Sequence, residues 1–188
     1  MVRAAPRTWR DVSAQSAGHP LIVTAGLPRD LAAWATGLRR RHFPPERNYL
    51  DAHVTLFHAL PPQCEDEASA LLGQFAREFS PVDARLDRVI SLGGGTALAI
   101  ESDGMLQIRR LIADHFHGLL TAQDQHQPRL HITIQNKVSS AAAKAVQGEL
   151  ADIFAPRDFT FHGLELHRYL GGPWKNLGKF AFRGKARA

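Results

Sequence analysis

Two short stretches of the sequence repeat one pattern: HVTL occupies positions 53–56 and HITI occupies positions 131–134. Each reads His, apolar, Thr, apolar, and the two copies stand in opposite halves of a chain of 188 residues. In a strand, side chains two residues apart point to the same face, so each His stands beside its Thr while the apolar residues face the core. Two imidazoles and two hydroxyls meet if the halves pack together.

The pattern around the two stretches repeats as well. Apolar spacing, β-branched runs and turn residues predict helices and strands in an order that is nearly the same in both halves. The predicted strands are 20–25, 49–60, 82–92, 96–101, 129–138, 159–169 and 179–182, and the predicted helices are 31–41, 65–79, 103–120 and 139–154. Asp30 is the predicted N-cap of the first helix.

Mixed helices and hairpin-linked strands indicate an α+β fold rather than a doubly wound parallel sheet. We expect two pseudo-symmetric lobes, each with an antiparallel sheet and helices, around a central cleft. Residues 1–18 are expected to form a flexible N-terminal arm. Residues 19–188 are expected to form a single domain, with lobes at approximately 19–95 and 96–188 that can exchange strands.

Charge is distributed unevenly along the chain. The 23 Lys and Arg and 18 Asp and Glu leave a net charge of +5, with basic ends and an acidic middle that contains both repeated stretches. This balance is modest for a dedicated nucleic-acid binder. The single cysteine, Cys64, excludes an internal disulfide and a cysteine-rich zinc module, and no apolar run is long enough to span a bilayer. We expect a monomer in the cytoplasm, away from membranes.

The paired His and Thr residues suit chemistry on a phosphate diester. A neutral imidazole can take a proton from an attacking hydroxyl, an imidazolium can protonate the leaving oxygen, and Thr hydroxyls can bind the non-bridging oxygens. This chemistry requires neither a metal nor a cofactor. The alternative interpretation is that both are ordinary strand histidines beside Thr residues with high β-propensity.

The stretches YLDAHVTLF at 49–57 and HITIQNKV at 131–138 resemble the 2H phosphoesterase superfamily, in its 2′-5′ RNA ligase-like (HXTX) branch. The resemblance covers approximately residues 20–184. It implies a bilobal α+β fold and metal-independent hydrolysis of 2′,3′-cyclic phosphates at RNA or nucleotide ends, giving a 2′-phosphate. The implied catalytic residues are His53, Thr55, His131 and Thr133, and we favour His131 as the base and His53 as the acid.

One departure from the family pattern concerns the residue before the second His, which is Pro in many relatives and Leu130 here. Two other activities remain open. In 2′-5′ RNA ligation a 5′-hydroxyl replaces water at the same acid and base, and in a nucleotide- or RNA-binding module the fold is kept with little turnover. The substrate class within RNA ends and cyclic nucleotides also remains open.

Regular alternation extends the predicted site along both strands. It places Arg129, Gln135 and Lys137 on the face of His131, and Phe57 on the face of His53. Two aromatic residues are candidates for stacking on a base: Trp174, in a predicted loop, and Tyr49, at the start of a predicted strand. Each candidate has an alternative role: a strand Phe is usually in the core, a Lys at a strand end is usually solvated, and Trp174 or Tyr49 can simply pack beneath its own loop. His162 and His167 are interpreted as structural.

Overall fold

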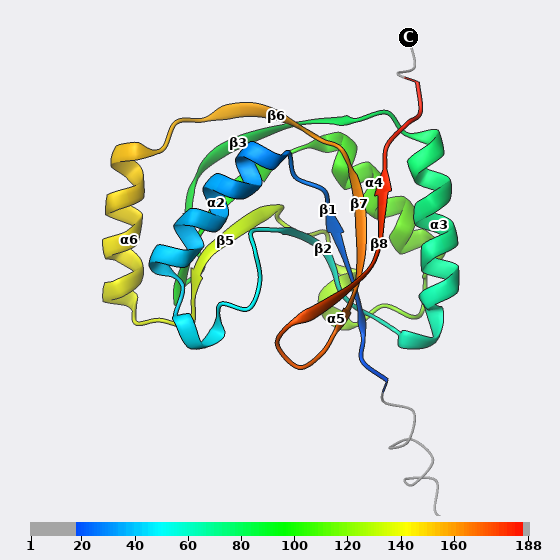
Figure 1. The fold of residues 1–188 in the computed structure, drawn as a ribbon, viewed down its shortest axis with the longest axis horizontal. Coiled ribbons are helices and arrows are strands. Elements are labelled where there is room, and N and C mark those ends of the chain that lie inside the picture. Colours follow the sequence, from blue (N-terminus) through cyan, green and yellow to red (C-terminus); the bar gives the residue numbers. More distant parts are fainter. Residues whose placement is uncertain (1–17, 186–188) are drawn as a thin grey trace, which may run out of the picture.

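The computed structural model describes residues 18–185 and contains two four-stranded antiparallel sheets with helices (Figure 1). The first sheet has the order β2-β1-β7-β8, with strands Val54–Leu60, Leu21–Ala25, Gly163–Tyr169 and Trp174–Ala181. The second has the order β5-β4-β3-β6, with strands His131–Asn136, Gly95–Glu101, Val82–Ser91 and Arg157–Phe161. The expected α+β class with antiparallel sheets is confirmed. Apart from Gly18, the expected arm lies outside the described residues.

Each sheet takes strands from both halves of the chain. The C-terminal hairpin β7–β8 pairs with β1, while β3 from the first half pairs with β4 and β6. A boundary near residue 95 therefore does not separate the sheets.

The chain changes sheets at His162, where the sequence predicted one strand over 159–169. The N–H of His162 donates to the carbonyl oxygen of Gly26 at 3.1 Å, and the N–H of Gly26 donates to the carbonyl oxygen of Gly163 at 2.8 Å. A Cβ at Gly163 would lie 2.3 Å from the carbonyl oxygen of Phe180. Only glycine fits this close approach of β7 to β8. The hydrogen bonds with Gly26 mark the point where the predicted single strand divides into β6 and β7, which lie in different sheets.

The helices follow the predicted periodicity closely. Their bounds are α2 Arg29–His42, α3 Glu65–Glu78, α4 Asp103–His115, α5 Ala122–Gln125 and α6 Ser140–Ile153, with 3₁₀ turns at Pro45–Arg47 and Pro62–Cys64. The hydroxyl of Ser139 caps α6 by accepting from the N–H of Ala142. Helix α4 ends five residues before the predicted end because the chain turns at Gly118, where φ is 82°. Pro28, not Asp30, occupies the N-cap of α2.

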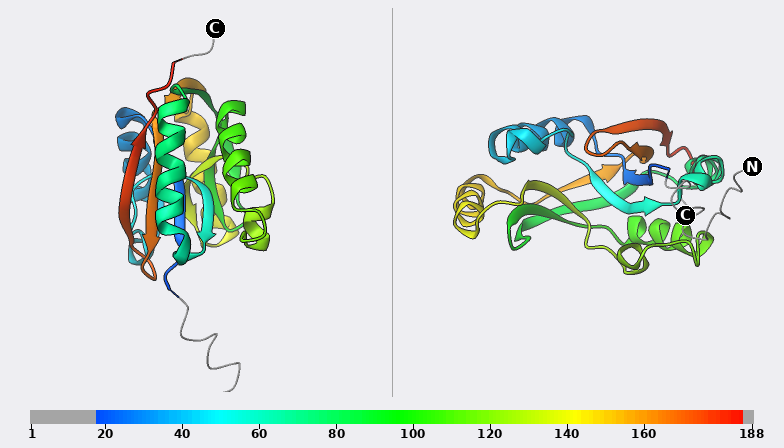
Figure 2. Two further views of the ribbon diagram at one scale, coloured as in Figure 1. Left: turned by 90° about the vertical axis from the view of Figure 1, so that its right-hand side faces the viewer. Right: turned by 90° about the horizontal axis from the view of Figure 1, so that it is seen from below.

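One continuous core joins both sheets, with α6 and α3 at opposite ends of the molecule (Figures 1 and 2). The apolar residues of both repeated stretches belong to this core and are at most 1% exposed: Val54, Leu56, Ile132 and Ile134. Burying each such side chain contributes about 1.5–3 kcal/mol, so the inward face of each stretch is strongly specified. Within residues 18–185, no helix has the length and apolarity to cross a membrane.

Candidate active site

The two motif histidines occupy equivalent places at the start of neighbouring strands. His131 is the first residue of β5, and His53 immediately precedes β2 rather than lying inside a strand as predicted. The strands β2 and β5 contact each other, although they belong to different sheets. The site therefore forms where the edges of the two sheets meet.

Each of the two imidazoles is held by a hydrogen bond of the same kind. Nδ1 of His53 donates to the carbonyl oxygen of Asp51 at 2.8 Å, and Nδ1 of His131 donates to the carbonyl oxygen of Arg129 at 2.7 Å. A carbonyl oxygen only accepts, so Nδ1 carries the hydrogen in each ring. In the neutral form of each histidine, Nε2 is therefore the nitrogen that can accept a proton.

Each motif Thr is followed by a bulge in its strand. In the first sheet, Thr24 pairs with Thr55 but Val23 pairs with Phe57; in the second, Ala97 pairs with Thr133 but Thr96 pairs with Gln135. Two residues therefore oppose one, and the alternation of side chains reverses after each Thr. The same irregularity at the same distance from each His strengthens the structural equivalence of the two halves.

The bulges remove two predicted residues from the site. Phe57 is fully buried, and its ring lies under the Arg109 guanidinium at 4.5 Å. Gln135 is only 5% exposed. The expectation that both share the face of their motif Thr assumed regular strands and is wrong.

Helix α2 supplies the contacts that hold the segment before His53. Arg39, which is 3% exposed, donates from Nε to the carbonyl oxygen of Leu50 at 3.1 Å and from Nη2 to Oδ1 of Asn48 at 3.1 Å. The hydroxyl of Thr36 accepts from the N–H of Ala52 at 2.9 Å. These side chains satisfy main-chain groups that a strand partner would otherwise pair, which explains why the predicted strand over 49–60 begins only at residue 54.

Arg39 also reaches the second motif. Its Nη1 donates to the carbonyl oxygen of Thr133 at 2.8 Å, so one buried guanidinium contacts main chain on both sides of the site. Burial lowers the pKa of Arg39 to about 10, and the opposing attraction of Asp51 is smaller. Arg39 therefore remains a cation at neutral pH.

The environment of His53 favours its neutral form. Burial is the main cause that lowers the pKa of His53, to about 4, and the positive charges of Arg39, His167 and His131 lower it further. The hydrogen bond to the Asp51 carbonyl acts in the opposite direction but is outweighed. At pH 7 the ring of His53 is therefore uncharged, and its Nε2 is a proton acceptor.

A cavity of about 410 Å³ opens beside His53. The ring of Trp174, at the start of β8, packs against His53 with 4.6 Å between ring centroids and against His167 with 5.4 Å. Nε2 of His167 lies 3.0 Å from the hydroxyl oxygen of Thr24, and burial lowers the pKa of His167. Tyr49 also lines this cavity and is 60% exposed.

Comparison with known proteins places the chain in a family. Residues 27–173 match the profile of the 2′-5′ RNA ligase superfamily. The chain belongs to this superfamily. The resemblance inferred from the two motifs is therefore confirmed. A search of curated protein sequences finds no match.

Solved structures share the fold of this superfamily member. The protein TT0787 of Thermus thermophilus is 20% identical with a TM-score of 0.61, and the match covers 88% of this chain and 99% of that one. A structure of a phosphoesterase is 18% identical with a TM-score of 0.62, covering 88% and 98%. Escherichia coli LigT complexed with NADP+ is 18% identical with a TM-score of 0.59, also covering 88% and 98%. At these identities the likeness shows the two-lobed fold.

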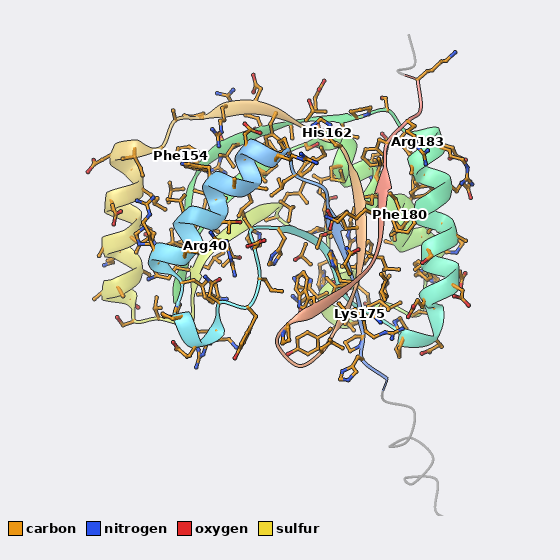
Figure 3. The ribbon with its side chains drawn as sticks, viewed as in Figure 1. Arg40, Phe154, His162, Lys175, Phe180 and Arg183 are labelled. Atoms are coloured by element: carbon orange, nitrogen blue, oxygen red, sulfur yellow. The ribbon has the colours of Figure 1, made fainter. Side chains whose placement is uncertain are left out.

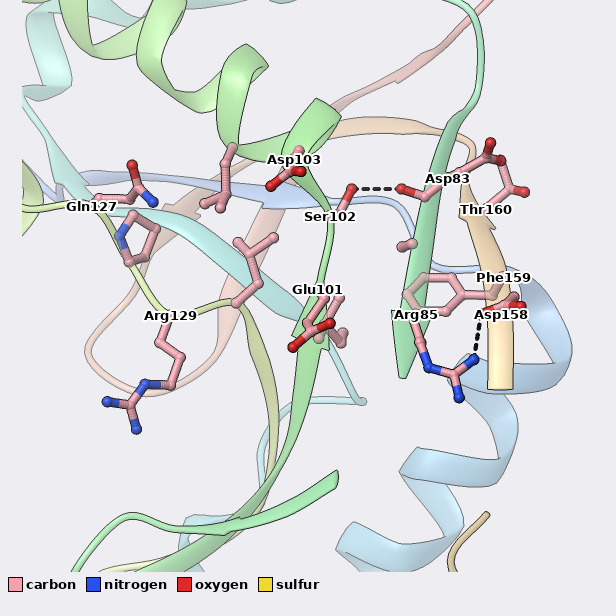
Figure 4. Close-up of a pocket in the computed structure, with 15 residues that line it drawn as sticks. Asp83, Arg85, Glu101, Ser102, Asp103, Gln127, Arg129, Asp158, Phe159 and Thr160 are labelled. Atoms are coloured by element: carbon pink, nitrogen blue, oxygen red, sulfur yellow. Dashed lines mark hydrogen bonds and ion pairs between the residues drawn. The ribbon is translucent and has the colours of Figure 1, made fainter. Parts of the chain in front are cut away.

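Neither of the two predicted substrate-binding cations lines the cavity of His53. Lys137 is exposed in the turn after β5, where its φ is 57°. Arg129 lines a second, larger cavity of about 1020 Å³ on the other sheet, shown in Figure 4. Carboxylates outnumber arginines around this second cavity, whose charged residues are Asp83, Glu101, Asp103, Asp158, Arg85 and Arg129. Its charge is therefore unfavourable for a phosphate.

Sequence reasoning missed Arg39 and His167. Arg39 was one of four arginines in and around a predicted helix, and nothing local distinguishes the buried one. His167 was interpreted as structural, but it lines the cavity beside His53 together with Glu165. The spacing of two residues on a predicted strand already placed these two side chains on one face.

Proposed function

We propose that this member of the 2′-5′ RNA ligase superfamily is a metal-independent phosphodiesterase. Its substrates would be 2′,3′-cyclic phosphates at RNA or nucleotide ends, and its product a 2′-phosphate. The observation that carries the proposal is the matched anchoring of His53 and His131, whose Nδ1 atoms both donate to a carbonyl two residues earlier. This leaves two Nε2 atoms, one just before β2 and one at the start of β5, for proton transfer at one phosphate.

The ionisation of His53 supports a specific division of roles. His53 is neutral at pH 7 and would accept a proton from the attacking water as the new P–O bond forms. His131, as imidazolium, would donate its Nε2 proton to the 3′-oxygen as the P–O3′ bond breaks, which leaves the phosphate on the 2′-oxygen. The hydroxyls of Thr55 and Thr133 would donate to the non-bridging oxygens. This assignment reverses the roles favoured from the sequence.

General acid and base catalysis of this kind contributes typically about 10²–10⁴-fold for each group. The direct test is hydrolysis of an oligonucleotide ending in a 2′,3′-cyclic phosphate, in excess EDTA, with identification of the product isomer. His53→Ala and His131→Ala should each lose at least about 10²-fold in kcat. His117→Ala is the matched control, because His117 is exposed outside both motifs.

The proposal fails if either motif variant retains full activity, or if EDTA abolishes the activity of the native protein. The same residues would also serve 2′-5′ ligation, in which a 5′-hydroxyl of a second RNA takes the place of water. Adding a 5′-hydroxyl oligonucleotide to the assay distinguishes the two reactions, because ligation yields a longer, RNase-resistant 2′-5′ linkage. Binding without turnover in the native protein would identify a nucleotide-binding module instead.

A further inference from the structure

A buried threonine makes the surroundings of the two motifs different. Thr24, in β1, pairs with Thr55 of the first motif, whereas Ala97, in β4, pairs with Thr133 of the second. Both pairs come directly before the bulge in their sheet, so Thr24 and Ala97 occupy equivalent positions. The first motif therefore has a second hydroxyl beside its own, and the second motif has a methyl group at that place.

The hydroxyl of Thr24 belongs to the same side of the sheet as the first motif. Residues directly opposite each other in antiparallel strands have Cβ atoms about 4.5–5.5 Å apart on one face. Thr24 is 3% exposed, and it lines the cavity of about 410 Å³ together with His53. A phosphate oxygen that accepts from the Thr55 hydroxyl is therefore within reach of the Thr24 hydroxyl as well.

The hydrogen bond between Thr24 and His167 has a defined direction. The Glu165 carboxylate only accepts, so Nδ2 of Asn176 is the amide atom that lies 3.3 Å from it. The same Nδ2 lies 3.5 Å from Nδ1 of His167, which makes Nδ1 an acceptor. The hydrogen of the neutral ring is therefore on Nε2, and Nε2 donates to the Thr24 hydroxyl oxygen at 3.0 Å.

The surroundings of His167 favour this neutral ring. Its side chain is 13% exposed, and burial is the main cause that lowers its pKa, with a further contribution from Lys179. The nearby Glu165 carboxylate acts in the opposite direction. A second ring hydrogen would be on Nδ1 and would face the amide hydrogens of Asn176, so the hydrogen-bond geometry also disfavours protonation.

This direction leaves the hydrogen of the Thr24 hydroxyl available. A threonine hydroxyl has one hydrogen to donate, and here its oxygen already accepts from His167. Within residues 18–185, His167 is the one hydrogen-bond partner of this hydroxyl. A donor hydrogen beside Thr55 without an acceptor in the described part of the chain suits an anionic oxygen, to which hydrogen bonds are strongest.

We propose that Thr24 binds the same non-bridging phosphate oxygen as Thr55, and that His167 positions the Thr24 hydroxyl for this contact. The inference rests on the proposed function and adds a difference between the two non-bridging oxygens. The oxygen at the first motif receives two hydroxyl hydrogen bonds, and the oxygen at the second motif receives one. Negative charge that develops on the two oxygens in the transition state is therefore stabilised unequally.

The first test removes the hydroxyl while keeping the shape of the side chain. Thr24→Val should lower kcat/KM for uridine 2′,3′-cyclic phosphate by about 10- to 100-fold, the loss expected for a hydrogen bond to a charged group. Thr96→Val is the matched control, because Thr96 is fully buried and its hydroxyl donates to the carbonyl oxygen of Ala143 at 3.2 Å. It should lower stability but keep the native kcat/KM. Native kcat/KM in Thr24→Val would overturn the inference.

A sulfur substitution identifies the oxygen that Thr24 contacts. The two diastereomers of uridine 2′,3′-cyclic phosphorothioate place sulfur, a weak acceptor, at one or the other non-bridging position. Thr24→Val should reduce the ratio of oxygen to sulfur rates several-fold for one diastereomer and leave it unchanged for the other. If Thr24→Val slows all three substrates by the same factor, its effect is structural and the proposed contact is wrong.

The role of His167 is tested by the donor that it supplies. His167→Gln keeps an N–H at the place of Nε2 and should retain most of the activity, whereas His167→Leu should lose about as much as Thr24→Val. In the Thr24→Val background, His167→Leu should cost little more, because both changes remove one interaction. Losses that multiply, or a glutamine variant as slow as the leucine variant, would show that His167 does not act through Thr24.

A binding measurement separates this inference from the proposed reaction. If the native protein hydrolyses no cyclic phosphate, the proposed function fails, and calorimetry with inorganic phosphate then decides the inference without turnover. Phosphate should bind the native protein and Thr96→Val equally, and Thr24→Val about tenfold more weakly or less. Equal affinity of the native protein and Thr24→Val, or no binding to either, would overturn the assignment of Thr24.

Discussion

The Nη1 atom of Arg39 donates a hydrogen bond of 2.8 Å to the carbonyl oxygen of Thr133. The same guanidinium bonds the carbonyl of Leu50, three residues before His53, so a single buried side chain from α2 ties the two motifs to each other. This connection explains how strands from two separate sheets can hold a common site.

Replacing Arg39 should therefore affect both stability and chemistry. Arg39→Gln leaves buried carbonyl groups without donors, which costs about 1–3 kcal/mol of unfolding free energy for each. It also removes a positive charge that lowers the pKa of His53, so the acid limb of the kcat/KM profile should move to higher pH. Urea denaturation and a pH profile measure the two effects.

Arg40→Gln is the control for this prediction, because Arg40 is the neighbouring residue and its side chain is 75% exposed (Figure 3). It should leave stability within about 0.5 kcal/mol and the pH profile unchanged. An Arg39→Gln variant with native stability, or with an acid limb at the native pH, would contradict the role assigned to Arg39.

Stability should depend on pH through His53. Its pKa is depressed to about 4 in the folded protein, against about 6.5 unfolded, so the unfolded chain binds more protons between these values. The stabilisation from keeping His53 neutral is fully present above about pH 6.5 and is lost as pH falls towards 4, with a magnitude on the order of 3 kcal/mol. Urea denaturation of the native protein and of His53→Gln, at about pH 7 and about pH 4, measures this change in the unfolding free energy.

The glutamine variant lacks the titrating group, so its unfolding free energy should fall less than that of the native protein over this range. His117→Gln corrects for the loss of an exposed histidine. If the native protein and His53→Gln show parallel pH dependence, the folded protein does not hold His53 neutral.

Acid should also weaken the hydrogen bonds that the buried carboxylate of Asp124, in α5, accepts from β2. Burial alone would raise the pKa of this carboxyl, but hydrogen bonds from the His58 ring and from the backbone N–H groups of His58 and Ala59 hold the pKa below its usual value. Asp124→Asn should lower the unfolding free energy at pH 7 by about 2–4 kcal/mol, since it removes a charge from this buried network.

The depressed pKa sets the sign of the pH effect. Stabilisation by Asp124 is present above its unfolded pKa and is lost as pH falls through the folded value, so the native protein and Asp124→Asn should converge in acid. Urea titrations at pH 7 and pH 3 measure the difference, and Asp152→Asn, at an exposed position, is the control. A difference that persists undiminished at pH 3 would be inconsistent with this account.

Phe57 and Tyr49 should separate stability from substrate affinity. Phe57→Ala removes a fully buried ring and should cost about 3–5 kcal/mol of unfolding free energy, with little change in KM for the protein that remains folded. Tyr49→Ala truncates a side chain that is 60% exposed and should change stability by less than about 0.5 kcal/mol while raising KM. Thermal melts and steady-state kinetics on both variants measure this contrast. A raised KM in Phe57→Ala would instead indicate that Phe57 contributes to substrate binding.

Local patterns were sufficient for much of this molecule. The sequence alone determined the two motifs, the helices over 65–79 and 139–154 within one or two residues, and the burial of Val54, Leu56, Ile132 and Ile134. These features depend on periodicity and short-range capping, which are encoded within a few residues of each position. The order of elements also predicted the α+β class, and the two motif stretches carried the resemblance to the superfamily.

Tertiary structure decided everything that depends on a distant partner. The bulges after Thr55 and Thr133 arise from pairing with β1 and β4, and they turned Phe57 and Gln135 away from the site. The break at His162 required close packing against another strand. The hydrogen bonds of Arg39 reach a strand of the second sheet, and His167 bonds a residue near the start of the chain. A one-dimensional pattern records which side chains alternate, but a strand's register and a side chain's partner are properties of the assembled sheets.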